Sequence, residues 1–250
     1  MLFFIVPYRC TTQPERAHQL QLFIHTMQSF IPDACIVVAE QSGDTLFNRG
    51  GLLNAAVAAC PAEDESVLCF HDLNVLPTVD CIHEYVRPLS KNSVRHLRAT
   101  GSHKTLSEII FMRYSDFRKV NGFPNDFWGC DGTDDELHLR ILRKGLRIER
   151  SEGTLLNLNR LQPPSPSSKT ANTRWERADW HRANPGAQGL AQLVEGTCSP
   201  VSCTPKLHHY KVNVCYRVPP ENAHARSLFC ARASVRNETT CTILDTRAHV

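Results

Sequence analysis

The sequence lacks several features that would assign it at once to a class of protein. Its net charge is only +3, and no clustered basic stretch is interleaved with aromatic residues, which argues against a nucleic-acid partner. The opening apolar run, Leu2–Val6, is far shorter than the roughly 20 residues of a bilayer span, and no basic segment precedes it. We therefore expect neither a transmembrane segment nor a signal peptide in this chain. No internal repeat is present.

Cysteine is plentiful, but its spacing does not indicate a metal site. The chain has 11 cysteines, an odd number, and none forms a Cys-x-x-Cys pair, which argues against a structural zinc site. The count fits a protein of the secretory lumen with at least one thiol left free. Scattered buried thiols explain the six N-terminal cysteines equally well.

Apolar segments alternate between two periodicities along the first half of the chain. Continuous apolar runs, expected for strands buried on both faces, lie at Leu2–Val6, Cys35–Ala39 and Val67–Phe70. Apolar residues at helical spacing fill residues 14–30 and 52–60, between these runs. The alternation predicts an α/β fold with a doubly wound, Rossmann-like and mostly parallel central sheet. Further short strands are expected at Ile109–Met112, Leu146–Ile148 and 207–217.

The remaining segments separate a larger domain from a C-terminal region. Residues 90–108 are polar and poorly periodic, whereas a helix is expected over Thr133–Lys144. A Pro/Ser-rich stretch that begins at Gln162 is typical of a linker. We therefore divide the chain into a sheet-containing domain, residues 1–160, and a linker with a cysteine-containing C-terminal extension, residues 161–250.

Polar residues follow the expected strands at the point where each one ends. In an open parallel sheet this edge is where ligands bind. Asp72 leaves a buried strand, and Asn74 offers a second oxygen two residues later. Such a pair can hold a divalent ion on a diphosphate, although the neutral Asn74 oxygen would hold it weakly. An aspartate that merely caps a turn explains the same pattern about as well.

A second motif, Asn121–Glu136, places adjacent acids at the start of the expected helix. Either Asp134 or Asp135 could accept a proton from a sugar hydroxyl, and the other could bind the acceptor sugar. Trp128 could supply an apolar platform for a sugar ring. For Glu136 we favour a simpler interpretation, a capping box with Thr133.

A third motif, Gln41–Asn54, contains an aromatic and a basic residue before an expected helix. Phe47 could stack on a base, and Arg49 begins a helix whose N-terminus could face a diphosphate. On spacing alone, an ordinary loop with a surface arginine is the simpler interpretation.

Taken together, the segments resemble the β-1,4-galactosyltransferase family. Val6-Pro-Tyr-Arg9 is similar to the family's Val-Pro-Phe-Arg. Residues 41–54 are similar to Gln-x-Gly-Asp-x-x-Phe-Asn-Arg-x-x-Leu-Leu-Asn. Residues 72–77 are similar to Asp-Val-Asp-Leu-Ile/Leu-Pro, and residues 121–135 to Asn-Gly-Phe-Pro-Asn-x-Tyr-Trp-Gly-Trp-Gly-Gly-Glu-Asp-Asp. The four motifs occur in the family's order, and the resemblance covers about residues 1–150.

The resemblance implies a GT-A fold for residues 1–160 and transfer of a hexose from a UDP-sugar to a glycan acceptor with inversion. The hexose would be galactose, N-acetylgalactosamine or N-acetylglucosamine, and Mn²⁺ the cofactor. It also implies residence in the Golgi or another secretory-pathway lumen. Asp134 matches the family's general base, Asp135 an acceptor-binding acid, and Asp72 and Asn74 its metal motif. The positions that match donor-binding residues are Pro7, Tyr8, Arg9, Phe47, Arg49 and Asp72.

Several positions depart from the family pattern. Asn74 replaces the second aspartate of the metal motif, and residues 155–161 contain no counterpart of its metal-binding histidine. Cys130 and Thr133 replace a tryptophan and an acid. The departures leave three alternatives: weak metal binding, a cation-independent mode that uses a basic side chain near the diphosphate, or an inactive member that binds a glycan, a nucleotide or a protein partner.

Overall fold

A computed structural model describes most of the first 158 residues and two shorter segments of the C-terminal region. The described residues are 1–9, 14–43, 46–100, 106–129, 132–158, 188–194 and 198–214. The predicted boundary at residue 160 lies outside these ranges, as does the Pro/Ser-rich stretch.

The first half of the chain forms the expected alternation of strands and helices. The apolar runs become β1 (Leu2–Tyr8), β2 (Cys35–Gln41) and β3 (Val67–His71), and the helical patterns become α1 (Pro14–Phe30) and α2 (Arg49–Ala59). No helix in the described part of the chain is long and apolar enough to cross a membrane.

Shorter elements complete the described structure. The strands are β4 (Val75–Pro77), β5 (Ser93–Ala99), β6 (Ile109–Arg113), β7 (Arg147–Gly153), β8 (Leu155–Asn157), β9 (Cys198–Thr204) and β10 (Leu207–Val212). The α-helices are α3 (Ile82–Val86), α4 (Tyr114–Lys119) and α5 (Thr133–Arg143), and the 3-10 helices are η1 (Val79–Cys81) and η3 (Leu190–Gln192).

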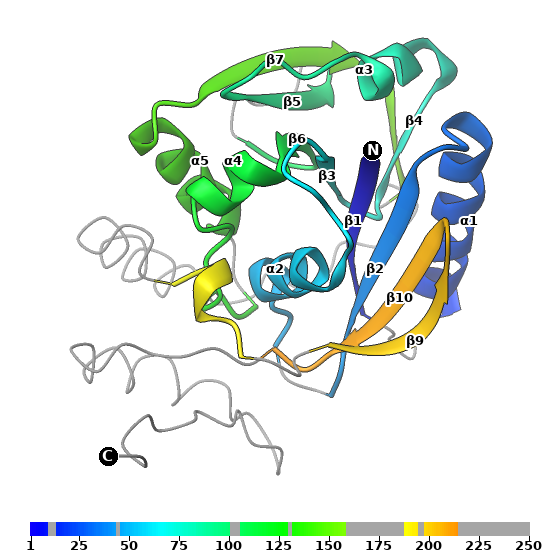
Figure 1. Ribbon diagram of the computed structural model, residues 1–250. Helices are drawn as coiled ribbons and strands as arrows, with labels where there is room; N and C mark the ends of the chain where they lie inside the picture. The colour runs from blue at the N-terminus through cyan, green and yellow to red at the C-terminus, as the bar shows by residue number, and fades with distance from the viewer. Residues whose placement is uncertain are drawn as a thin grey trace.

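The central sheet has eight strands in the order β7-β5-β6-β3-β1-β2-β10-β9 (Figure 1). The pairs β1–β2, β1–β3, β2–β10 and β5–β7 are parallel, whereas β6 runs antiparallel to both β3 and β5, and β9 runs antiparallel to β10. The fold is therefore α/β with a mixed, mostly parallel sheet, as the sequence predicts.

Helices cover both faces of the sheet, because successive side chains of a strand point to opposite faces. Phe3 and Ile5 belong to one apolar cluster with residues of α2, α4 and α5. Phe4 and Val6 belong to a second cluster with residues of α1 and α3. This double burial explains why β1 is apolar throughout rather than alternating.

The described part of the C-terminal region belongs to the same sheet. β10 pairs in parallel with β2, with Leu207 opposite Ile36 and Val212 opposite Gln41. The strand expected at 207–217 is confirmed over Leu207–Val212. The predicted division at residue 160 thus does not separate two sheets, because the extension supplies an interior strand and an edge strand of the one sheet.

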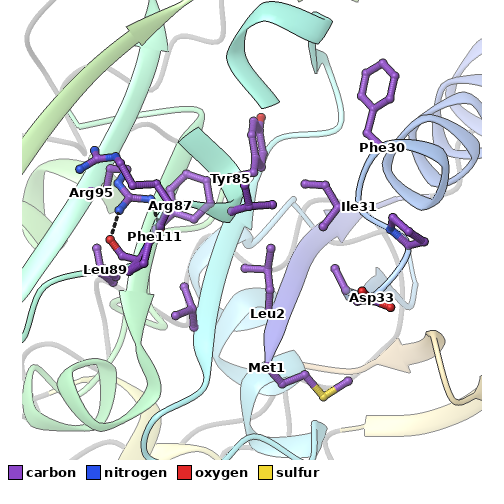
Figure 2. A pocket seen from close by; sticks show the side chains of 15 residues that line it. Met1, Leu2, Phe30, Ile31, Asp33, Tyr85, Arg87, Leu89, Arg95 and Phe111 are labelled. Carbon is purple, nitrogen blue, oxygen red and sulfur yellow. Dashed lines mark hydrogen bonds between the residues drawn. The ribbon is translucent and has the colours of Figure 1, made fainter. Parts of the chain in front are cut away.

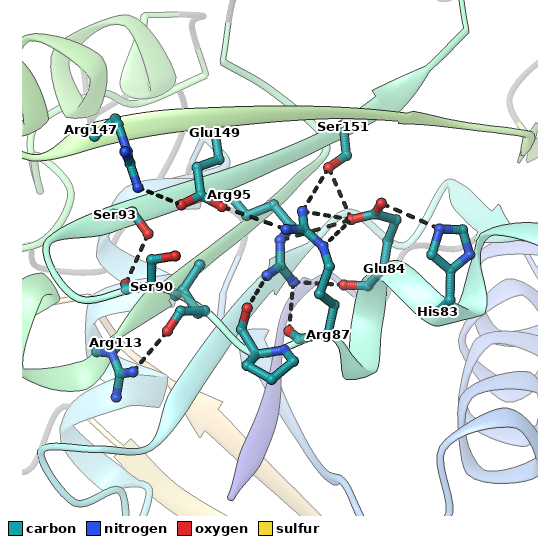
Figure 3. A network of polar contacts seen from close by, with 12 residues as sticks. His83, Glu84, Arg87, Ser90, Ser93, Arg95, Arg113, Arg147, Glu149 and Ser151 are labelled. Atoms are coloured by element: carbon teal, nitrogen blue, oxygen red, sulfur yellow. Dashed lines mark hydrogen bonds and ion pairs between the residues drawn. The ribbon is translucent and has the colours of Figure 1, made fainter.

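A buried arginine fixes the far end of the sheet, where β5, β7 and α3 meet (Figure 3). Arg95 of β5 is 1% exposed. Its Nη1 donates to the carbonyls of Glu84 (2.7 Å) and Arg87 (3.0 Å), and its Nη2 donates to that of Pro88 (2.7 Å). Carbonyls at a helix end have no partner within the helix, so Arg95 stabilises the end of α3 and the residues that follow it.

The six cysteines within the described ranges are all free thiols. Cys35, Cys69 and Cys81 are buried, and burial raises the pKa of each of these three thiols. For these three, the interpretation as buried apolar side chains holds.

Candidate active site

The carboxyl ends of three neighbouring parallel strands carry most of the predicted site. β1 ends at Tyr8, β2 at Gln41 and β3 at His71, and β1 lies between the other two. Asp72 follows β3 directly. The crevice expected at this edge therefore collects residues from segments far apart in the sequence.

Arg49 joins the two acids that the sequence singles out. Its Nε donates to Asp72 Oδ1 at 3.0 Å, and its Nη1 donates to Asp134 Oδ1 at 2.6 Å. The Arg49 side chain is 17% exposed, and the two carboxylates are 28% and 24% exposed. Nη2 of Arg49 is buried and has no hydrogen-bond partner among the described residues. The interpretation of Arg49 as an ordinary surface arginine is therefore wrong.

The start of α2 is held in place by side-chain amides. Asn48 caps the helix, with its Oδ1 accepting from the Gly51 N–H at 2.8 Å. Its own N–H donates to Gln41 Oε1 at 2.8 Å, and its Nδ2 donates to the Asn125 carbonyl at 2.6 Å. Gln41, Asn48 and Asn54 of the third motif thus serve mainly to fix Arg49, a role that sequence reasoning did not assign to them.

Asn54 ties the loop of the second motif to α2. Its Nδ2 donates to the Phe123 carbonyl (2.7 Å) and to Asn125 Oδ1 (2.8 Å), and its Oδ1 accepts from the Phe123 N–H (3.0 Å). Gly50 permits the loop to approach α2 closely, because a Cβ at this position would lie 2.2 Å from the Pro124 carbonyl oxygen. The starts of α2 and α5 are consequently brought together.

Asp134 has the electrostatics of a group suited to proton transfer. It lies in the first turn of α5, where the helix dipole favours a negative charge. Burial nevertheless raises its pKa to about 6, and the nearby Asp72 and Asp135 also raise it, whereas Arg49 acts in the opposite direction. A carboxyl group with this pKa changes its protonation state near neutral pH.

A tight turn after β3 presents Asp72 and Asn74. The Val75 N–H donates to the Asp72 carbonyl at 3.2 Å, and the Leu158 N–H donates to the Asn74 carbonyl at 2.7 Å. Asn74 Oδ1 accepts a hydrogen bond from Nη1 of Arg16, which also donates to Gln19 at 3.1 Å. Sequence reasoning did not identify Arg16, because no local pattern marks a contact between residues 58 positions apart.

His71 stands next to Asp72 but belongs to the core. Its Nε2 is 2.9 Å from the Tyr85 hydroxyl, and its Nδ1 is 3.0 Å from the Asp72 carbonyl oxygen. Burial lowers its pKa to about 4. With both ring nitrogens engaged and the ring packed against Phe4 and Phe23, His71 supports the turn rather than binding a ligand.

The donor set at this turn does not fit a divalent ion. Asp72 is bonded to Arg49, and Asn74 is bonded to Arg16, so each oxygen ligand already faces a cation. Leu158, which lies beside Asn74, has no ligating atom in its side chain. Within the described ranges, no three His, Cys, Asp or Glu side chains form a group that could hold a metal.

The other predicted site residues lie around this centre. Pro7 and Tyr8 are buried, and Arg9, Phe47 and Asp135 are partly exposed. Nη2 of Arg9 donates to the Gly43 carbonyl at 3.5 Å, and the Phe47 carbonyl accepts from the Gly129 N–H at 2.7 Å. Trp128 is 7% exposed and packs in the core, so little of its ring faces solvent.

The capping box predicted for Thr133 and Glu136 is not formed. The residue before the first turn of α5 is Gly132, which has no side chain to cap the helix. Glu136 is instead buried beside Arg140, whose Nε donates to its Oε1 at 3.0 Å. Arg140 also donates to the Gln188 carbonyl at 2.5 Å, so this ion pair anchors the segment 188–194 against α5.

A hollow of about 420 Å³ lies elsewhere, at the amino end of β1 (Figure 2). Met1, Leu2, Tyr85 and Phe111 contribute to its lining. Because β1 runs from Leu2 to Tyr8, this hollow and the Asp72 turn lie at opposite ends of the strand. It is therefore separate from the candidate active site.

Comparisons with known proteins find similarity to galactosyltransferases. A family model described as the N-terminal domain of galactosyltransferase matches residues 92–162. β-1,4-galactosyltransferase 3 of Cricetulus griseus is 31% identical over 161 residues, which cover 58% of this chain and 38% of that protein. β-1,4-galactosyltransferase 1 of Homo sapiens is 30% identical over 157 residues, with the same coverage. The match thus spans 38% of the length of these relatives.

Solved structures share the fold. The catalytic domain of Drosophila β-1,4-galactosyltransferase 7, in complex with xylobiose, has a TM-score of 0.65 at 21% identity and covers 85% of this chain and 94% of that one. A mutant of the same enzyme, in complex with manganese, UDP-Gal and xylobiose, has a TM-score of 0.66 at 20% identity. With its matched motifs and its α/β fold, the chain is similar to the β-1,4-galactosyltransferases.

Proposed function

We propose that this protein is an inverting glycosyltransferase that transfers a hexose from a UDP-sugar to a glycan acceptor, with Asp134 as the general base. The observation that carries the proposal is the single guanidinium of Arg49 between Asp72 and Asp134. Arg49 holds Asp72, the proposed donor-side acid that follows β3, close to Asp134, the proposed base in α5. Transfer between two bound sugars requires the groups that act on them to be held together in this way.

The chemistry assigned to Asp134 is proton removal. Its carboxylate accepts the proton of an acceptor hydroxyl while the hydroxyl oxygen forms a bond to the anomeric carbon of the donor. The bond between that carbon and the phosphate oxygen breaks, and its electron pair leaves with UDP, so the anomeric centre is inverted. A pKa of about 6 suits this role, because the group is largely ionised at neutral pH and remains basic.

Arg49 supplies positive charge on the donor side. Its buried, unpartnered Nη2 can donate to a phosphate oxygen, which would satisfy a group that is costly to leave unpaired. The other proposed donor-binding residues are Pro7, Tyr8, Arg9, Phe47 and Asp72. UDP-Gal is bound in the Drosophila structure, which favours galactose. N-acetylgalactosamine and N-acetylglucosamine remain in the proposal, because a few contacts decide the choice.

Asp135 is the proposed acceptor-binding residue, whereas Trp128, which packs in the core, offers little surface to a sugar ring. Asp135 follows the base directly in the first turn of α5 and is partly exposed. The acceptor is a glycan or glycoconjugate, a class that includes the xylobiose of the Drosophila complexes. The proposed location of the reaction is the Golgi or another secretory-pathway lumen.

The resemblance also implies a manganese cofactor. Manganese is present in the Drosophila structure with UDP-Gal, and here Asp72 and Asn74 would be its ligands. When bound, such an ion neutralises the diphosphate of the leaving group. The two guanidinium contacts favour a cation-independent mode over the weak metal site that the sequence also allowed.

A turnover assay tests the proposal. The protein is incubated with UDP-galactose, UDP-N-acetylgalactosamine or UDP-N-acetylglucosamine and a panel of glycan acceptors, and the glycan product is measured. We expect Asp134→Asn to lower product formation by about 10²- to 10⁴-fold, the usual contribution of a general base. The exposed acid Asp64 provides the matched control, Asp64→Asn, which should leave turnover unchanged. Equal turnover in the Asp134 variant would remove this residue from the role of base.

A second candidate is a catalytically inactive family member that binds a nucleotide, a glycan or a protein partner. The observation in its favour is that Asp72 and Asn74 are both engaged by arginines rather than free for a metal. UDP binding with no transfer to any acceptor, with or without Mn²⁺, would favour this alternative over the enzyme.

A further inference from the structure

We propose that Arg16 replaces the divalent cation at the Asp72–Asn74 turn and binds the diphosphate of the donor together with Arg49, so that donor binding needs no metal. This inference rests on the proposed function, which it extends by naming the residue that supplies the charge. Arg16 lies in the first turn of α1, and its Nη1 donates to Asn74 Oδ1.

The charge balance of the turn supports this substitution. In the family's pattern the charges of two aspartates and a divalent ion cancel. Here Asn74 is neutral, and the charge of Arg16 cancels that of Asp72. The exchange of an aspartate for Asn74 and the arrival of a guanidinium thus leave the same net charge for an incoming diphosphate to meet.

The position of Arg16 is not explained by the helix that carries it. A cation in the first turn opposes the helix dipole, which favours negative charge at this end. Burial lowers the pKa of Arg16, whereas the charges of Tyr8 and Asp72 act in the opposite direction. The Arg16 side chain is half-buried near Tyr8 and Asp72, at the ends of β1 and β3. Partial burial of its charge costs free energy, and the dipole of α1 does not offset that cost.

Arg16 has donors left for a ligand. Among the described residues its hydrogen bonds run from Nη1, to Gln19 and Asn74, which leaves Nε and Nη2 available. Nη2 of Arg49, whose Nε is bonded to Asp72, is likewise without a partner in the described structure. Two guanidinium groups with unused donors thus contact Asp72 and Asn74 of one turn, an arrangement suited to two phosphate groups.

Calorimetric titration with UDP, in EDTA and in Mn²⁺, tests the inference without requiring turnover. We expect wild-type affinity to agree within about twofold between the two conditions. Arg16→Gln should weaken binding in EDTA by about 10- to 100-fold, the range for hydrogen bonds to charged groups. Arg16→Lys should recover part of the loss, because it retains the charge but not the fork of donors. Arg147→Gln removes an exposed arginine and should bind as wild type.

A double variant tests whether the replacement of the metal by Arg16 can be reversed. Arg16→Gln combined with Asn74→Asp removes the guanidinium and restores the pair of acids, so we expect UDP binding that Mn²⁺ now strengthens. Circular dichroism of each variant checks that the fold is intact. If Arg16→Gln does not fold, the comparison of wild type in EDTA and Mn²⁺ still decides the question.

Each outcome has a distinct meaning. Wild-type binding that requires Mn²⁺, or an Arg16→Gln variant that binds UDP in EDTA as wild type does, overturns the role of Arg16 but leaves the transferase proposal standing. Metal-independent binding that is lost in Arg16→Gln supports the inference even if no sugar is transferred, in which case the proposed function alone fails. Absence of UDP binding under all conditions overturns both.

Discussion

The pH dependence of transfer should respond in opposite directions to the two neighbours of Asp134. If Asp134 is the base, the rate at saturating donor should rise with pH through a midpoint near 6, its pKa in the folded protein. Arg49 lowers that pKa, so Arg49→Gln should move the midpoint upward. Asp72 raises it, so Asp72→Asn should move the midpoint downward.

The contacts set the size of the upward movement. The 2.6 Å bond from Arg49 to Asp134 is charge-assisted, a class worth about 1.5–3 kcal/mol. One pKa unit corresponds to about 1.36 kcal/mol, so loss of this bond should raise the midpoint by about one to two pH units. Solvent screening reduces the effect toward the lower value, since both side chains are partly exposed.

The assay is the rate of product formation between pH 5 and 9 at saturating donor and acceptor, which removes the effect of either substitution on substrate affinity. A wild-type midpoint near 4, or midpoints that move in the same direction in both variants, would refute the assignment of Asp134 as the titrating base. Asp64→Asn, a substitution remote from the site, should leave the midpoint unchanged.

The same pKa predicts how stability depends on pH. The pKa of Asp134 is raised from its ordinary 3.8 to about 6 on folding. Its contribution to stability is therefore fully present below about pH 4 and is lost as the pH rises through about 6. Urea unfolding of wild type and Asp134→Asn at pH 4 and pH 7 should show the wild type losing more stability than the variant across this interval. A larger loss in the variant would contradict the raised pKa.

Three further substitutions test the scaffold, each by urea denaturation. Gly122→Ala should cost about 2–5 kcal/mol, because φ is +61° at this residue and a Cβ would lie 2.3 Å from Asn54 Oδ1; a neutral effect would show that the loop relaxes. Arg140→Leu should cost about 3–5 kcal/mol by removing the guanidinium that pairs with the buried Glu136, and adding Glu136→Leu should recover much of the loss. Arg95→Leu strips three carbonyls of their donor and should cost about 3–6 kcal/mol; a cost below about 1 kcal/mol would mean that water replaces the guanidinium.

The elements that sequence reasoning located are those with a simple burial pattern. β1 and β2 are apolar throughout because helices cover both faces of the sheet. β5 was not recognised, since Arg95 and His96 interrupt its apolar run. Both are buried, and the carbonyls that make the burial of Arg95 tolerable are contributed by another element. β9 was missed because it is largely exposed and polar.

In the candidate site, too, sequence reasoning missed the residues whose role depends on contacts with distant parts of the chain. The motifs were sufficient to single out Asp72 and Asp134, but not the Arg49 guanidinium that joins them and that lies 85 positions from Asp134 in the sequence. Arg16 carries no local signal at all, because its significance depends on Asn74, which only the folded chain brings near. The assignments of the site residues to donor, base and acceptor therefore stay predictions until the substitutions above are measured.

The place of β10 beside β2 has a consequence for biosynthesis. Leu207 lies opposite Ile36, so this pairing joins positions 207 − 36 = 171 residues apart. During translation the edge of β2 is completed long after β1, α1 and α2 have left the ribosome. Until then its backbone donors and acceptors have no strand on that side, a state prone to pairing with other chains. We expect the nascent protein to depend on chaperones until β10 emerges, and truncation before residue 207 to leave it prone to aggregation.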